Sequence, residues 1–129
     1  MRIFVVALGA ASMFATQAVA NDARFERQLK MLDPGVRLEQ LCDYTAMASI
    51  KKDSREHRPD RALANARAEP KVKGDTIEAM GAAFRSRKKW YELSYSCTAD
   101  AEHMKVLSFK YKIGDEIPES NWAAYNLFD

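Results

Sequence analysis

The residues best suited to chemistry in this sequence are cations that crowd around one aromatic residue. The cluster comprises Arg85, Arg87, Lys88, Lys89 and Trp90, and a predicted neighbouring strand adds Lys110 and Lys112. A flat aromatic ring among cations can bind an anionic glycan, a lipid head group or an acidic protein partner. The alternative is a solvated turn whose charges protect a sheet edge, with Trp90 covered by a connecting segment.

Charge in the rest of the chain is close to balanced. A second group of cations, Arg55, Arg58 and Arg61, surrounds Pro59-Asp60 and is typical of a solvated connector. The formal net charge of the whole chain is +2. A protein that coats nucleic acid has a larger basic excess, so we expect no nucleic-acid partner.

Catalysis would have to use His57 or His103, the two histidines of the chain. A small hydrolase or transferase would need one of them beside a carboxylate such as Asp60 or Asp100. Neither histidine adjoins a Gly-x-Ser-x-Gly turn, and no His, Asp or Glu pair has the spacing of a metal site. We therefore expect a non-enzymatic domain without cofactor or metal, and keep the hydrolase or transferase as the alternative.

Residues 1–20 have the pattern of a secretory signal peptide. Arg2 supplies the positive start, residues 3–15 are mostly apolar, and Ala18-Val19-Ala20 offers small residues for cleavage. The apolar run is shorter than the roughly 20 residues that a membrane-spanning helix needs. We expect cleavage before Asn21, a mature domain of residues 21–129 without a membrane span, and export to the periplasm or beyond.

Cys42 and Cys97 are the only cysteines, and both lie in the expected mature domain. An even number of cysteines in an exported protein favours a disulfide, and two residues allow a single pairing. Free or metal-binding thiols are the alternative, but the CxxC spacing common in zinc sites is absent.

The elements that must position these residues change in kind near Pro59. Before it, apolar residues recur at helical spacing, which predicts helices over residues 22–32 and from Asp33 to a charged connector at 51–59. After it, the predicted strands are 61–68, 76–78, 82–85, 89–98 and 104–113, with a break at Gly81. From Pro118, a short helix carries Trp122, Tyr125 and Phe128 at intervals of three.

The two longest predicted strands alternate apolar and polar residues. The apolar positions are Tyr91, Leu93, Tyr95 and Cys97, then Leu107, Phe109, Tyr111 and Ile113. This alternation predicts an antiparallel sheet that is covered on one face. We expect a small single-domain α+β fold, in which two N-terminal helices and a short C-terminal helix pack on the apolar face beside the disulfide.

Seven segments of the expected mature domain have sequences typical of one protein family. They are 37–43 (RLEQLCD), 57–61 (HRPDR), 72–75 (VKGD), 81–87 (GAAFRSR), 90–97 (WYELSYSC), 103–109 (HMKVLSF) and 117–122 (IPESNW). Over about residues 29–128 the chain resembles a bacterial family known as domain of unknown function 930. The resemblance implies an exported protein of alphaproteobacteria related to the rhizobia. It implies no particular activity, substrate or active-site residue.

The expected function is therefore binding. We expect the polar sheet face or the basic hairpin to contact an envelope protein or an anionic envelope polymer. A secreted inhibitor of another enzyme is a further alternative, because a disulfide-stapled domain with a protruding charged hairpin suits that role.

Overall fold

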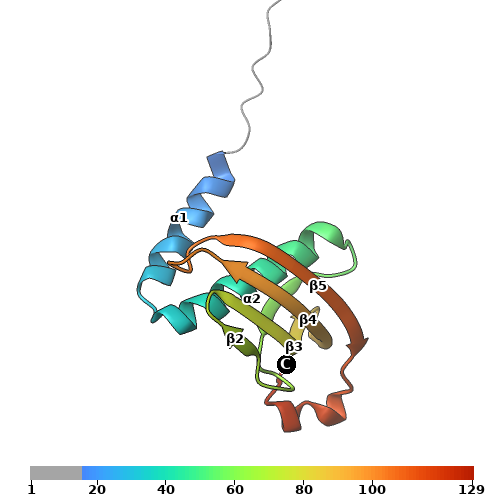
Figure 1. Ribbon diagram of the computed structural model, residues 1–129. Coiled ribbons are helices and arrows are strands. Elements are labelled where there is room, and N and C mark those ends of the chain that lie inside the picture. Colours follow the sequence, from blue (N-terminus) through green and yellow to red (C-terminus); the bar gives the residue numbers. More distant parts are fainter. Residues whose placement is uncertain (1–15) are drawn as a thin grey trace, which may run out of the picture.

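Helix α2 lies along one face of an antiparallel sheet, and helix α1 precedes it (Figure 1). The computed structural model describes residues 16–129, with side chains from residue 23. The predicted signal peptide, residues 1–20, falls largely outside these residues and stays a prediction. Helix α1 spans Thr16–Lys30 and α2 spans Pro34–Asp53. As predicted, Asp33 is the N-cap of α2, and Pro34, whose φ suits a helix start, is its first residue.

Five strands form the sheet in the order β1-β3-β4-β5, and β2 pairs with the first part of β3. The strands are β1 (Pro59–Leu63), β2 (Lys71–Lys73), β3 (Thr76–Ser86), β4 (Lys89–Ala99) and β5 (Val106–Glu116). All of these pairings are antiparallel. The predicted α+β fold class is confirmed.

Strand β3 is longer than predicted because it continues through Gly81, so the predicted break there is wrong. Its pairing with β4 shifts between Ala79 and Ala82, which makes a β-bulge that bends the strand without ending it. A Cβ on residue 81 would lie 2.8 Å from the Cβ of Ala68. The turn after β1 can therefore approach β3 only because residue 81 is glycine. Strand β1 itself ends at Leu63, before the predicted end at residue 68.

The main core lies between α2 and the sheet. Its buried side chains include Leu38, Cys42, Ala46 and Ile50 of α2, and Ile77, Phe84, Leu93, Tyr95 and Cys97 of the sheet. Cys42 and Cys97 form a disulfide, with their Cα atoms 6.1 Å apart, which confirms the predicted pairing. Because successive strand residues point to opposite faces, Leu93, Tyr95 and Cys97 all point toward α2.

The C-terminal segment forms a second, smaller core on the opposite face, which differs from the prediction that it packs beside the N-terminal helices. It contains two short 3-10 helices, η1 (Glu119–Asn121) and η2 (Ala123–Tyr125). Ile117 and Leu127 pack there with Ala83 and Trp90. The physical reason is the alternation of β3 and β4, which places Ala83 and Trp90 away from α2 and leaves apolar surface to be covered.

The alternation of apolar and polar residues predicts Leu107 on the covered, apolar face of the sheet, but its side chain is 68% exposed. The β4–β5 pairing shifts between Thr98 and Ala99, which pair with Ser108 and Val106. The shift leaves Leu107 unpaired, and Val106 instead packs against the core.

Candidate functional site

The structure brings the two cationic segments of the sequence together at one end of the domain. Ser86 pairs with Lys89, so Arg87 and Lys88 form the two-residue turn of the β3–β4 hairpin. The connector between α2 and β1 lies against this hairpin. Its Arg58 backbone N–H donates to Ser86 Oγ at 2.9 Å, and the Arg87 Nε–H donates to the Glu56 carbonyl oxygen at 3.2 Å.

We call this surface the basic end and define it as residues 51–61 and 85–89. Its cations are Lys51, Lys52, Arg55, Arg58, Arg61, Arg85, Arg87, Lys88 and Lys89. The two segments contain these nine cations and three carboxylates, whereas the rest of the chain contains eleven cations and fifteen carboxylates. The positive charge is thus concentrated here, although the whole chain carries only +2.

The hairpin turn has an unusual backbone for its residues. Arg87 has φ 52° and Lys88 has φ 67°, both in the left-handed region. Two-residue hairpins with this geometry favour Asn-Gly, because the left-handed conformation costs other residues roughly 1–2 kcal/mol each. The chain therefore places an arginine and a lysine at two turn positions whose left-handed backbone conformation disfavours both.

Arg85 binds a carboxylate through two hydrogen bonds, whereas Arg87 bonds only the Glu56 carbonyl oxygen and Lys89 forms an exposed ion pair of 3.5 Å with Glu116. The Arg85 guanidinium binds the Asp60 carboxylate from Nε to Oδ1 at 2.8 Å and from Nη2 to Oδ2 at 3.1 Å. This contact holds the pKa of Asp60 below its usual range. Arg85 also lies 5.8 Å from the centroid of the Trp90 ring. Arg85 thus links β1, β3 and β4 within the basic end.

Trp90 does not lie at the surface among the cations, which corrects its expected place in the site. It is fully buried, and its Nε1–H donates to the Phe128 carbonyl oxygen at 2.8 Å. The interpretation that Trp90 is covered is the correct one, although the cover is the C-terminal segment and not a connector. Its ring therefore has no free face for a ligand at the surface.

Lys110 and Lys112 belong to a different surface. They pair with Ser96 and Ser94 on the face of the sheet opposite α2. These serines lie four and six residues from Trp90 along β4, which is roughly 13–20 Å at about 3.3 Å per residue. The expected site of seven residues is therefore divided: the hairpin cations join the connector, and the two β5 lysines do not.

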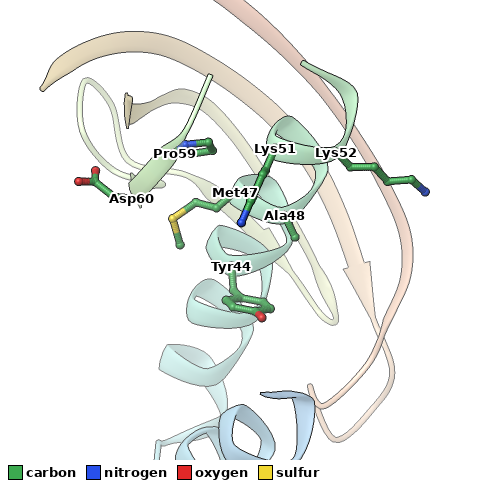
Figure 2. A pocket seen from close by; sticks show the side chains of 7 residues that line it. All are labelled: Tyr44, Met47, Ala48, Lys51, Lys52, Pro59 and Asp60. Atoms are coloured by element: carbon green, nitrogen blue, oxygen red, sulfur yellow. The ribbon is translucent and has the colours of Figure 1, made fainter. Parts of the chain in front are cut away.

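Two grooves border the basic end. The first, of about 650 Å³, is lined by Tyr44, Met47, Ala48, Lys51, Lys52, Pro59 and Asp60. Figure 2 shows Met47 extending toward Asp60, whereas Lys52 extends away from the other side chains. The second, of about 520 Å³, is lined by Lys51, Ser54, Arg55, His57, Arg58 and Pro59. Lys51 and Pro59 line both, so the two grooves adjoin.

Neither histidine contacts Asp60 or Asp100, the two carboxylates named as examples, although His103 contacts a third, Asp75. His57 packs edge-on against Phe84 and Tyr91, with ring centroids 5.0 and 4.7 Å away. Its candidate partner Asp60 is bound by Arg85. Asp100 instead accepts hydrogen bonds from the backbone N–H groups of Met104 and Lys105, which hold its pKa below the usual range.

His103 is a buried contact between three turns of the chain. Its Nδ1 lies 2.7 Å from the Pro34 carbonyl oxygen, and its Nε2 lies 2.8 Å from Asp75 Oδ1. The ring thus connects the start of α2 to the β2–β3 turn and the β4–β5 turn. Both nitrogens are occupied by structural partners.

Sequence reasoning missed Asp43, a buried carboxyl group in the core. Its side chain accepts a hydrogen bond from the Tyr95 hydroxyl at 2.8 Å, and burial raises its pKa to about 7. The spacing of Asp43 before Ala46 and Ile50 was the available signal, because residues three and seven apart share a helix face. An aspartate on α2 is otherwise typical of the solvent-exposed face.

No group of three or more His, Cys, Asp or Glu that could hold a metal ion occurs between residues 16 and 129. In the same part of the chain, no helix has the length and apolar character needed to cross a membrane.

Comparison with known proteins gives one family. No curated protein and no solved structure matches the chain. The model of the family described as Domain of Unknown Function (DUF930) matches residues 29–127, from the end of α1 through all five strands to the C-terminal segment. This match confirms the resemblance noted in the sequence, and the chain belongs to the DUF930 family.

Proposed function

We propose that this domain is an exported, non-enzymatic binding module whose basic end contacts an anionic polymer or an acidic protein of the cell envelope. The observation that carries the proposal is the junction of hairpin and connector. The Arg87 Nε–H bond to Glu56 and the Arg58 N–H bond to Ser86 join two cationic segments into one surface.

The hairpin turn adds a second argument. Strained residues persist where the surrounding structure enforces them, and they cluster at functional sites. Arg87 and Lys88 occupy left-handed positions that Asn-Gly would fill at lower conformational cost. The Arg87 side chain bonds Glu56 within the fold, and the exposed Lys88 adds a cation that a partner could contact.

The number of cations favours a partner with many charges. A single exposed ion pair contributes only about 0.2–1 kcal/mol, because water and salt screen it. Useful affinity at the basic end therefore requires several contacts at once, as a polyanion or an acidic protein surface provides. Binding of this kind weakens steeply as salt concentration rises.

The disulfide supports the cellular location in this proposal. Disulfides persist mainly in oxidising compartments such as the bacterial periplasm. The Cys42–Cys97 bridge therefore agrees with the predicted signal peptide. Together they favour a partner in the envelope over one in the cytoplasm.

Chromatography on immobilised heparin, used as a model polyanion, tests the proposal. The variant Arg87→Glu/Lys89→Glu reverses two charges on the hairpin, and Arg55→Glu/Arg58→Glu reverses two on the connector. The matched control Lys110→Glu/Lys112→Glu makes the same change on the open sheet face, by which we mean the surface around Met80, Ser94, Ser96, Lys110 and Lys112. We expect both basic-end variants to elute at clearly lower NaCl concentration than the wild type, with a much smaller shift for the control. Equal shifts for all three variants would show that net charge alone decides binding and would overturn the proposal.

A further inference from the structure

We propose that the grooves beside the basic end also bind a small ligand, a single anionic amphiphile, with its phosphate head among the connector cations and its alkyl chain in the adjoining groove on α2. This inference rests on the proposed function, because the head group would use cations of the basic end. It goes further by assigning a chemical class to the two grooves.

The first groove has an apolar floor on the outer side of α2. Met47 and Ala48 follow Tyr44 by three and four residues, which places them on the same helix face as Tyr44. Tyr44 is 37% exposed, and its ring stacks on Phe25 with centroids 4.0 Å apart. Met47 is partly buried against the main core, and Tyr44 and Ala48 are exposed beside it, so the floor of this groove continues the apolar surface of the core outward. An alkyl chain lying on this face would remove apolar surface from water.

The second groove is cationic. Lys51, Arg55 and Arg58 line it together with Ser54 and His57. Arg55 and Arg58 are exposed, and a phosphate group would offer several acceptor oxygens to these donors. The charge of this groove is complementary to an anionic head and unsuited to a cationic or zwitterionic one.

One carboxylate, Asp60, lines the first groove and bears on this assignment. Its two oxygens are bound by Arg85 at 2.8 and 3.1 Å. The pair is close to neutral in sum, so Asp60 does not cancel the attraction of the connector cations. Lys51 and Lys52 also line the first groove, so the alkyl chain is assigned to it because of its apolar floor and not because of its charge.

The adjoining positions of the grooves indicate one ligand with two parts. Lys51 and Pro59 line both, so a molecule can pass from the apolar floor to the cations without leaving the surface. The volumes, about 650 and 520 Å³, are each within the range of about 300–1,000 Å³ that small-molecule sites occupy.

NMR of [methyl-13C]methionine in the mature protein can test this assignment directly. Met47 reports on the groove, whereas Met80, 66% exposed on the open sheet face, and Met31, 85% exposed, serve as internal controls. The probes are dodecyl phosphate and octyl phosphate below their micelle concentrations, inorganic phosphate, and the uncharged dodecyl maltoside. We expect dodecyl phosphate to shift the Met47 methyl signal saturably and to leave Met80 unchanged.

The affinities separate the two parts of the ligand. A fully buried methylene group strengthens binding about fourfold, so even partial burial of four more methylenes makes dodecyl phosphate roughly tenfold tighter than octyl phosphate. Inorganic phosphate and dodecyl maltoside should each bind at least tenfold more weakly than dodecyl phosphate. Equal affinity for dodecyl phosphate and either of these two probes would overturn the inference. So would binding to phosphatidylglycerol vesicles that leaves Met47 unshifted, because that result indicates adsorption to a membrane surface.

A pair of variants separates this inference from the proposed function. Ala48→Gln places a longer polar side chain in the groove without changing charge, and Ala101→Gln makes the same change at an exposed turn residue. We expect Ala48→Gln to weaken dodecyl phosphate at least tenfold and to elute from heparin like the wild type. If dodecyl phosphate binds Ala48→Gln as tightly as it binds Ala101→Gln, the groove assignment is wrong. If the wild type binds heparin but not dodecyl phosphate, the inference fails and the proposed function stands.

Discussion

The Tyr95 hydroxyl donates a hydrogen bond of 2.8 Å to Asp43 Oδ1 inside the main core, joining β4 to α2 near the disulfide. The Asp43 side chain also accepts a hydrogen bond from the Ala64 backbone. Even so, burial dominates, and it raises the pKa of Asp43 to about 7. Glu39, one turn earlier on α2, adds to the rise through its charge, and its own pKa is raised by burial and by Glu69.

Asp43 makes folding stability depend on pH between about 4 and 7. In this window the folded state holds a proton on Asp43 that the unfolded chain, with its carboxyl pKa near 3.8, releases. The stabilisation is therefore complete below pH 4 and is lost as the pH rises toward 7. Asp43→Asn keeps an acceptor for Tyr95 but does not titrate. We therefore expect its free energy of unfolding, measured relative to that of the wild type, to rise by about 2–4 kcal/mol as the pH goes from 4 to 8.

Urea unfolding of both proteins at intervals of one pH unit measures this gain. The difference between wild type and variant is the informative quantity, because carboxylates with lowered pKa, such as Asp60, change stability in the opposite direction in both proteins. A difference that stays constant from pH 4 to pH 8 would contradict a raised pKa at Asp43.

We expect that relieving the strain of the hairpin turn increases stability and weakens binding to heparin. Replacing Arg87 and Lys88 by Asn and Gly provides residues that favour left-handed φ at both turn positions. We expect Arg87→Asn/Lys88→Gly to raise the free energy of unfolding by about 1–2 kcal/mol. The same variant should elute from heparin at lower salt than the wild type. A variant that is stabilised and binds heparin as well as the wild type would show that these two cations serve no binding role.

The disulfide is expected to supply a large part of the stability. The sequence separation of Cys42 and Cys97 is 55, and closing a loop of that size stabilises by about 4 kcal/mol in the chain-entropy model. Because domains of this size are typically stable by only about 5–15 kcal/mol, the double variant Cys42→Ala/Cys97→Ala should melt at a much lower temperature. Calorimetry of this variant and of the reduced wild type checks the expectation, and an unchanged melting temperature would contradict it.

His103 is expected to matter for folding and not for binding. Its ring bonds both the Pro34 carbonyl oxygen and Asp75 Oδ1, so His103→Ala removes two partly buried contacts. We expect a loss of about 1–3 kcal/mol in urea unfolding, with elution from heparin unchanged. Full stability of this variant would show that the three turns are held together by other contacts.

Local patterns explain the parts of the fold that could be predicted. The Asp33-Pro34 start of α2, the alternation from Tyr91 to Cys97 and the turn at Arg87-Lys88 each depend on neighbouring residues. The disulfide follows from the number of cysteines once export is assumed. These features need no knowledge of what lies across the molecule.

The remaining features depend on long-range packing. Alternation assigned Trp90 to the face opposite α2, but a period of two does not reveal what covers that face. The cover is the C-terminal segment, whose Phe128 carbonyl lies 38 residues along the chain from Trp90. Likewise, Arg58 meets Ser86 only because β1 pairs with the end of β3. The basic end is therefore a tertiary feature that two separate cationic segments of the sequence do not reveal.

The most direct test of the basic end is an amide NMR titration of the disulfide-bonded protein with a defined heparin oligosaccharide at low salt. The account predicts that the largest shifts fall within residues 51–61 and 85–89 and disappear as NaCl is added. Shifts centred on Lys110, Lys112 and the neighbouring strand residues Ser94 and Ser96 would place the binding surface on the open sheet face and contradict it.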